Sequence, residues 1–148
     1  MTLTASQFSA AQVATAKTIY QKIGAVFGLF AGFAATVNAF AEDSLHVNDP
    51  PSDEGKSFGP WRIQARAQIQ GNTGIDIRNA AIEDQCRALI WLLQNREKPA
   101  LAQIMAAQSY EDATRVWTVA FERPGAPGQA DKRVADVPVF LQILGLTE

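Results

Sequence analysis

Two adjacent carboxyl groups, Glu42 and Asp43, are the first candidates for chemistry in this sequence. They follow residues 23–41, a stretch without a single charged residue. A carboxyl group at the end of an uncharged helix is expected to be partly desolvated, and desolvation favours the protonated form. The partial negative charge at a helix C-terminus acts in the same direction. A group that holds a proton near neutral pH can serve as a general acid, for example toward the leaving oxygen of a glycosidic bond.

Further titratable residues follow this pair within a few positions. Asp49, Asp53 and Glu54 lie in the segment after Glu42 and have two interpretations. One of them could hold a water molecule for an inverting hydrolysis, or all three could be ordinary solvated loop acids. His46 lies four residues after Glu42, where the helix is expected to have ended, so we interpret it as a loop residue rather than a proton shuttle.

The composition is that of an ordinary globular domain. The 148 residues are 47% hydrophobic and 19% charged, which predicts a single domain over 1–148 with one core. A net charge of −2 lacks the basic footprint of a nucleic-acid binder. With one cysteine, Cys86, and one histidine, no internal disulfide, metal site or cofactor is expected. Cys86 falls among apolar positions at helical spacing and is predicted to be a small core residue.

The helix that ends near Glu42 must position its carboxyl group. We predict this helix over residues 25–41, after a first helix that begins at the capping box Ser9-x-x-Gln12 and ends near Gly24. On a helical wheel, a face of large apolar residues lies opposite a face of small ones that includes Glu42. The large face consists of Val26, Phe30, Phe33, Val37 and Phe40, and the small face of Gly28, Ala31, Ala35 and Asn38. The small face can pack closely against a neighbour or form the floor of a cleft.

The uncharged stretch has a second interpretation as a membrane helix. Residues 23–41 approach the roughly 20 residues that span a bilayer, and Gly28-x-x-x-Gly32 is a helix-packing pattern. The stretch nevertheless ends in two acids and is rich in alanine and glycine rather than leucine. We therefore favour a buried helix and expect no membrane span.

The remaining chain predicts a mainly α domain with an irregular or small β region at about 45–75. This region is rich in turn-forming residues, and so long a loop in a compact domain is typical of a functional site. Residues 63–70 fit either a strand or a helix. Further helices are expected from about residue 79, over 99–107, from the cap Ser109-x-x-Asp112 through Phe121, and from about Gln129 with an interruption near Pro138.

Four sequence blocks occur in an order typical of one family. They are AFAEDSLHVND (39–49), SFGPWRIQ (57–64), GIDIRNAAIEDQCRALIWLLQN (74–95) and WTVAFERPGAPGQADKRVADV (117–137). Together, from about residue 19 to residue 137, they resemble the phage tail lysozymes of the lysozyme-like superfamily. The resemblance implies a lysozyme-like α+β fold and cleavage of the β-1,4 bond of the peptidoglycan glycan, with Glu42 as the catalytic acid.

The same resemblance implies a location and partners. The chain would be a virion protein of the phage tail, or reside in the host cytoplasm before release, and would act on the bacterial cell wall in the periplasm. Its partners would be peptidoglycan strands and other phage tail proteins. Hydrolysis and lytic transglycosylation remain open, since the transglycosylases of this superfamily need no second carboxylate.

Five residues besides Glu42 correspond to the family's substrate site. Ser44 matches a serine that orders the following loop, while Ser57, Phe58 and Gly59 match one wall of the sugar cleft. Gly59 would let the backbone approach the glycan closely. Trp61 is the tryptophan best placed to stack on a sugar.

The segment after Gly59 departs from the family pattern, and a late Glu-Arg pair matches it but is interpreted as structural. The family commonly has a glutamine two to three residues after the glycine, where this chain has Trp61 and Arg62, and Pro60 is also unusual. These differences support an alternative in which the chain keeps the fold as an inactive structural or cell-wall-binding virion protein. Glu122 and Arg123 match a late Glu-Arg pair of the family, which we interpret as an ion pair holding a helix end.

Overall fold

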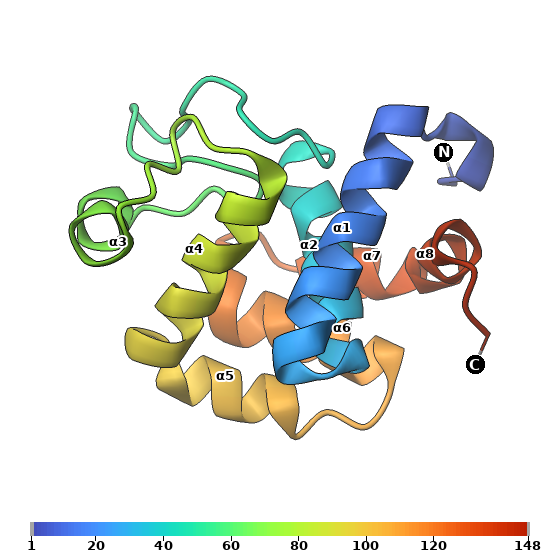
Figure 1. The fold of residues 1–148 in the computed structure, drawn as a ribbon. Helices are drawn as coiled ribbons and strands as arrows, with labels where there is room; N and C mark the ends of the chain where they lie inside the picture. The colour runs from blue at the N-terminus through green and yellow to red at the C-terminus, as the bar shows by residue number, and fades with distance from the viewer. Residues whose placement is uncertain (1, 148) are drawn as a thin grey trace.

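Helices make up most of the computed structural model, which describes residues 2–147 (Figure 1). The α-helices are α1 (Ala10–Phe27), α2 (Leu29–Asp43), α3 (Arg66–Thr73), α4 (Ile82–Asn95), α5 (Lys98–Met105), α6 (Tyr110–Trp117), α7 (Gln129–Ala135) and α8 (Val137–Leu144). A 3-10 turn, η1 (Ala5–Gln7), precedes them, and a π-helical turn, η2 (Thr118–Glu122), extends α6. Within the described residues, β structure is limited to isolated antiparallel bridges in the loop before α3. The mainly α class predicted from the sequence is confirmed.

Gly28 divides the uncharged stretch into two helices. Its φ of 99° and ψ of 159° are unsuited to residues with a side chain, and α1 ends there while α2 begins at Leu29. The predicted boundary at Gly24 and the single helix over 25–41 were therefore wrong, and Val26 belongs to α1, where it is 47% exposed. Among residues 2–147, no helix combines the length and the apolar character needed to cross a membrane.

Close packing of α1 on α2 explains the small residues of the stretch. A Cβ atom added to Gly32 would lie 2.5 Å from the carbonyl oxygen of Tyr20 and 2.9 Å from the amide nitrogen of Gly24, both in α1. The two backbones thus meet at Gly32 of α2 and the turn of α1 from Tyr20 to Gly24. Gly32 lies outside the small face named above, which carries Asn38 and Glu42 instead.

The helix α2 is the central element of the core. Its residues 31–39 are all buried, and it packs against α1 on one side and α6 on the other. Trp61 joins the loop to this helix, because its indole Nε1 donates a hydrogen bond to the carbonyl of Ala35 at 2.9 Å. Cys86 is buried in α4 as predicted, and burial raises the pKa of its thiol to about 12.

Several helix ends follow local signals in the sequence. The hydroxyl groups of Ser9 and Ser109 accept hydrogen bonds from Gln12 N and Asp112 N, which confirms both predicted caps. Pro99 lies in the first turn of α5. The last helical segment is interrupted between α7 and α8, shortly before Pro138, as predicted. The ambiguous segment 63–70 becomes helical from Arg66 onward, and α4 begins three residues later than predicted.

The loop after α2 and helix α3 form a lobe beside the helical body. In Figure 1 this lobe occupies the upper left part of the molecule, whereas both termini lie on the right. Residues Ser52 and Ser57, and then Phe58 and Ile63, form the two bridges that give the loop its shape. The loop returns the chain toward the end of α2, where Glu42 lies.

Candidate active site

Glu42 lies in the last turn of α2, at the boundary between the core and solvent. The helix ends because Ser44 and Leu45 both adopt left-handed backbone conformations, with φ of 56° and 63°. Leu45 is buried and anchors the turn. The Glu42 side chain is 23% exposed, so it is partly desolvated as the sequence predicted.

Arg133 of α7 holds the Glu42 carboxyl group. Its Nη2 lies 2.7 Å from Glu42 Oε2, and its Nη1 donates to Asn38 Oδ1 at 2.6 Å. The same Asn38 oxygen accepts a hydrogen bond from the Thr118 hydroxyl at 2.9 Å. Asn38 and Glu42 share one face of α2, as the helical wheel predicted, and Arg133 spans that face. Charge and hydrogen bonding thus connect α2, η2 and α7.

Glu122 is a second acid at the same end of the molecule. It closes η2, where the Arg123 amide donates to the Thr118 carbonyl at 2.8 Å, five residues earlier. Its Oε2 accepts from the Trp117 indole nitrogen at 3.3 Å. Burial raises the pKa of Glu122 well above its ordinary range, and the negative charge of Glu42 adds to the rise. The opposing influence of Arg133 is weaker.

Arg123 does not pair with Glu122, which corrects the prediction for these neighbours. Its Nη1 lies 2.9 Å from Glu97 Oε1, on the segment between α4 and α5. It also donates to the carbonyl of Ala120, so it does hold the helix end as expected. Its partner in the ion pair is a distant acid rather than the adjacent one.

Glu42 and Glu122 line one cavity of about 480 Å³. That volume is within the range of small-molecule sites. The loop contributes Arg62 and Gln64 to its wall, and Glu97 lies at its edge. Two carboxyl groups in unlike environments therefore face a common space, one beside a guanidinium group and the other desolvated. Such a pair can supply both a proton donor and a carboxylate to a bound substrate.

Ser57 and Phe58 organise the loop from within. Both are buried, and within the described chain neither is among the residues that line this cavity. The Ser57 hydroxyl donates to Asp53 Oδ2 at 2.5 Å, and Gln64 Nε2 donates back to it at 3.3 Å. The Phe58 ring lies 5.2 Å from the Arg66 guanidinium carbon. These contacts give both residues a supporting role behind the wall.

The backbone of Gly59 packs closely against the side chain of Gln85. Its φ is 76°, and an added Cβ would lie 2.7 Å from Gln85 Oε1. Gln85 is 1% exposed and donates to the carbonyl of Ile77 at 2.9 Å. The expectation that Gly59 lets a glycan approach is therefore corrected: this glycine lets the loop pack on α4.

Trp61 takes a position that differs from its expected role, whereas Ser44 lies at the start of the loop that it was expected to order. Trp61 borders the cavity but is 1% exposed, and its indole N–H is bonded to Ala35. We correct the expectation of a stacking platform, because so buried a ring offers almost no free surface. Ser44 is exposed, and its carbonyl accepts from Gln12 Nε2 at 3.0 Å, which ties the start of the loop to α1.

Arg62 is the departure from the family pattern with the clearest structural role. Its Nε donates to the Ser52 hydroxyl at 2.9 Å and its Nη2 to the Pro50 carbonyl at 2.6 Å. Its Nη1 lies 3.6 Å from Asp43 Oδ2, and its side chain is 9% exposed. Arg62 thus cross-links the loop and brings positive charge to the cavity wall.

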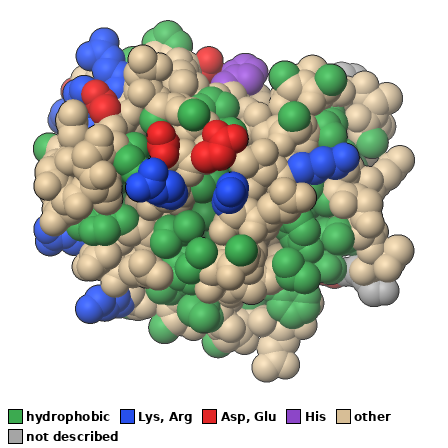
Figure 2. All heavy atoms as spheres, viewed as in Figure 1, with side chains coloured by type: hydrophobic (Ala, Val, Ile, Leu, Met, Phe, Trp, Pro, Cys, Tyr) green, Lys and Arg blue, Asp and Glu red, His purple; other side chains and the backbone are tan. Residues whose placement is uncertain are grey.

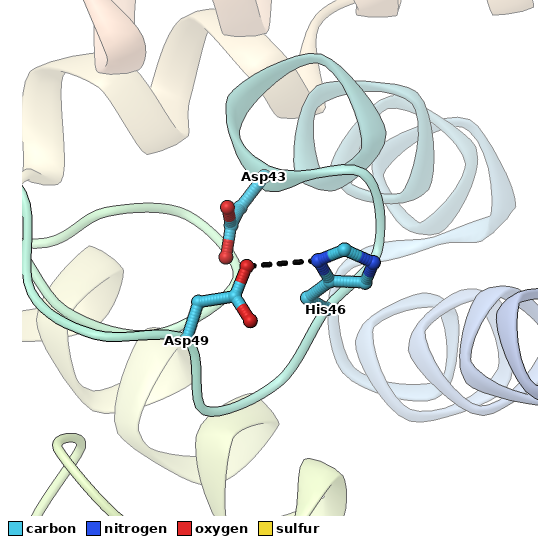
Figure 3. A group of neighbouring side chains, drawn as sticks. All are labelled: Asp43, His46 and Asp49. Atoms are coloured by element: carbon cyan, nitrogen blue, oxygen red, sulfur yellow. Dashed lines mark hydrogen bonds and ion pairs between the residues drawn. The ribbon is translucent and has the colours of Figure 1, made fainter.

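Asp43, His46 and Asp49 form a cluster next to this wall (Figure 3). One potential ligand atom from each lies within 4.8 Å of the others, and the two carboxyl groups face one another in the figure. Burial raises the pKa of Asp43 to about 6, with a further rise from Asp49, whereas a hydrogen bond from His46 lowers the pKa of Asp49. Because His46 Nδ1 is already bonded to Asp49 Oδ2 at 2.8 Å and Arg62 faces Asp43, we assign no metal to this cluster.

Neither the surface charge nor comparison with known proteins identifies a function for this site. On the face shown in Figure 2, acidic and basic side chains lie next to one another rather than in a patch of one sign. Comparison of the sequence with known family models and with curated proteins finds no match.

Proposed function

We propose that this chain cleaves the β-1,4 bond of the peptidoglycan glycan, with Glu42 as the general acid that protonates the leaving oxygen. The observation that carries the proposal is the shared cavity of Glu42 and Glu122. Glycosidic cleavage requires a protonated group of the enzyme. Most hydrolases also use a second carboxyl group that flanks the same glycosidic bond. The resemblance of the four sequence blocks to phage tail lysozymes supports the choice of peptidoglycan among glycans.

The positions of the loop residues fit a glycan site at this cavity. Arg62 and Gln64 make the wall polar, with the Arg62 guanidinium group bonded within the loop, and Ile63 and Leu92 contribute apolar surface. A sugar ring offers both hydroxyl groups and apolar C–H faces, so a mixed wall of this kind suits it. As a phage tail lysozyme, the protein would act on the cell wall in the periplasm and associate with other phage tail proteins.

The test is turnover of purified peptidoglycan by the unmodified protein and by Glu42→Gln. The substitution keeps the shape of the side chain and removes its proton. Since general acid catalysis contributes roughly 10²- to 10⁴-fold, turnover should fall by at least that lower factor. Glu54→Gln is the matched control, because Glu54 is exposed and, unlike Asp53, is not among the described residues that line the cavity, so its substitution should not affect turnover. Equal turnover by the wild-type and Glu42→Gln proteins would overturn the proposal.

The product separates the two reaction types. Attack by water leaves a new reducing sugar, whereas attack by the sugar's own hydroxyl group closes a ring and leaves none. Mass spectrometry of the released fragments distinguishes them by the mass of one water molecule.

A second candidate function rests on Arg62. Arg62 stands where the family commonly has a glutamine, and its side chain is committed to the loop through Ser52 and Pro50. If the altered wall cannot orient a glycan, the chain would be an inactive structural or wall-binding virion protein. Sedimentation with peptidoglycan, without turnover at any pH, would favour this alternative.

A further inference from the structure

We infer that Glu122 is a second working carboxyl group of this cavity, which holds the proton before substrate binds and supplies it to Glu42. The inference rests on the proposed function and adds to it the source of the proton. The site must explain how Glu42 can donate a proton while it is paired with a cation. A guanidinium group 2.7 Å from Glu42 favours a carboxylate there, yet a general acid must donate a proton.

Glu122 is held toward the cavity by rigid neighbours. The Trp117 ring is fully buried and donates to Oε2, whereas no hydrogen bond to Oε1 is present among the described residues. The π-helical turn that ends at Glu122 breaks the regular spacing of the helix, and such turns are frequent at functional sites. One oxygen is thus anchored while the other is open to exchange a proton.

The cations around Glu122 are already paired with other acids. Arg133 pairs with Glu42 and Arg123 pairs with Glu97, and within residues 2–147 no cation lies at ion-pair distance from Glu122. Glu122 is half-buried. An acid so placed that served only to stabilise the fold would be expected to take one of these partners, since charges removed from water are usually paired.

The other charged groups that face the cavity do not provide Glu122 with an ion-pair partner either. Arg62 is directed to Asp43, and Asp53 accepts the hydrogen bond of Ser57. If Glu122 ionised, the cavity would hold an unpaired negative charge beside that of Glu42. Two carboxyl groups in this situation hold one proton between them, and the environment decides where it resides. Arg133 pairs with Glu42 and not with Glu122, so we assign the shared proton to Glu122, whose pKa is raised by burial and by the neighbouring charge of Glu42.

The proposed step conserves protons. Glu122 passes its proton across the cavity to the Glu42 carboxylate, directly or through one hydroxyl group, and Glu42 donates it to the glycosidic oxygen as the bond to the anomeric carbon breaks. The attacking hydroxyl group, of water or of the sugar, bonds to that carbon and releases one proton. This proton returns to the carboxyl pair and restores the starting state.

The experiment combines a titration with kinetics. Side-chain carboxyl ¹³C resonances of glutamate are followed by NMR against pH in the wild-type protein, in Glu122→Gln and in Glu42→Gln. The resonance absent from Glu122→Gln belongs to Glu122. It should titrate at higher pH than the exposed glutamates, and in Glu42→Gln its titration should move to lower pH. Glu54→Gln, the same change at an exposed site, should leave it in place.

Kinetics then tests whether this proton is used. Glu122→Gln preserves an acceptor for the Trp117 indole, so the fold should be retained, which circular dichroism checks. We expect kcat to fall roughly 10²-fold with little change in KM, and the alkaline limb of the pH–rate profile to move to lower pH. A profile identical in shape to that of the wild type would reduce Glu122 to a structural role and overturn the inference.

The titration separates the two proposals. If the wild-type protein shows no turnover, the proposed function fails, and the NMR result alone decides on the shared proton. A Glu122 that titrates with the exposed glutamates, or that ignores Glu42→Gln, refutes the inference even where turnover is observed.

Discussion

Replacing Arg133 with methionine should destabilise the protein, and adding Glu42→Gln should restore part of the loss. Methionine is similar in length and apolar, so it fills the space of the guanidinium stem without a charge. The substitution removes a donor 2.7 Å from Glu42 Oε2 and another 2.6 Å from Asn38 Oδ1. Asn38 keeps the hydrogen bond from Thr118, but Glu42 is left as a half-buried carboxylate without its partner.

The magnitude follows from the burial of the two partners. Breaking a fully buried ion pair costs about 3–5 kcal/mol. Arg133 is 6% exposed but Glu42 is 23% exposed, so water can solvate part of the orphaned charge. We therefore expect Arg133→Met to lower the free energy of unfolding by about 2–3 kcal/mol. In the double variant no carboxylate is orphaned, and the two effects should be less than additive by about 1–2 kcal/mol.

Urea denaturation at pH 7 of the two single variants and the double variant measures this coupling. Arg115→Met provides the matched control, because Arg115 pairs with Asp131 at a similar 2.8 Å but the two side chains are 48% and 76% exposed. An exposed pair contributes little, so this variant should lose less than about 1 kcal/mol. Equal losses for the two methionine variants, or strict additivity in the cycle, would refute the electrostatic account of the site.

Two further predictions concern packing and pH. Gly32→Ala should destabilise the protein by roughly 2 kcal/mol or more, because its Cβ would meet the α1 backbone at 2.5 Å, while Gly71→Ala, in open space in α3, should stabilise it by about 0.5–1 kcal/mol. Thermal unfolding of both variants tests this, and a shared sign would contradict it. Because the pKa of Asp43 rises from 3.8 to about 6 on folding, its contribution to stability is present below pH 4 and lost as pH rises through 6. Asp43→Asn should therefore gain stability relative to wild type between pH 4 and pH 7.5, on the order of 1–2 kcal/mol after solvent screening, and a pH-independent difference in urea denaturation would exclude this role.

Local signals in the sequence predicted the helical class and several helix ends. The caps at Ser9 and Ser109 and the proline in the first turn of α5 act within a few residues, so a reader of the sequence can recognise them. Gly28 was missed as a boundary because Gly24, Gly28 and Gly32 are all candidates by residue type. Only the position of α1 against α2 determines that Gly28 takes the positive φ while Gly32 stays helical.

The role of Gly59 shows the limit of a residue-by-residue interpretation. A glycine in a turn predicts that something approaches the backbone closely, but the partner is 26 positions away, in α4. The family resemblance implied a glycan as that partner, whereas in the structure the partner is Gln85. Trp61 is similar, since the length of the loop did not reveal that its ring returns to α2.

The pairing of acids with cations is the part of the site that the sequence could least predict. Glu122 and Arg123 are neighbours and suggest an ion pair, but Glu122 ends the π-helical turn whereas Arg123 leaves it with a left-handed φ of 50°. Arg123 instead pairs with Glu97, and Arg133 pairs with Glu42 across 91 positions. Each pairing is a consequence of how α2, η2 and α7 pack, and within residues 2–147 they leave Glu122 without a cation at ion-pair distance. The proton that we assign to Glu122 is therefore a property of the folded arrangement, whereas the sequence suggested only an ion pair with Arg123 for this residue.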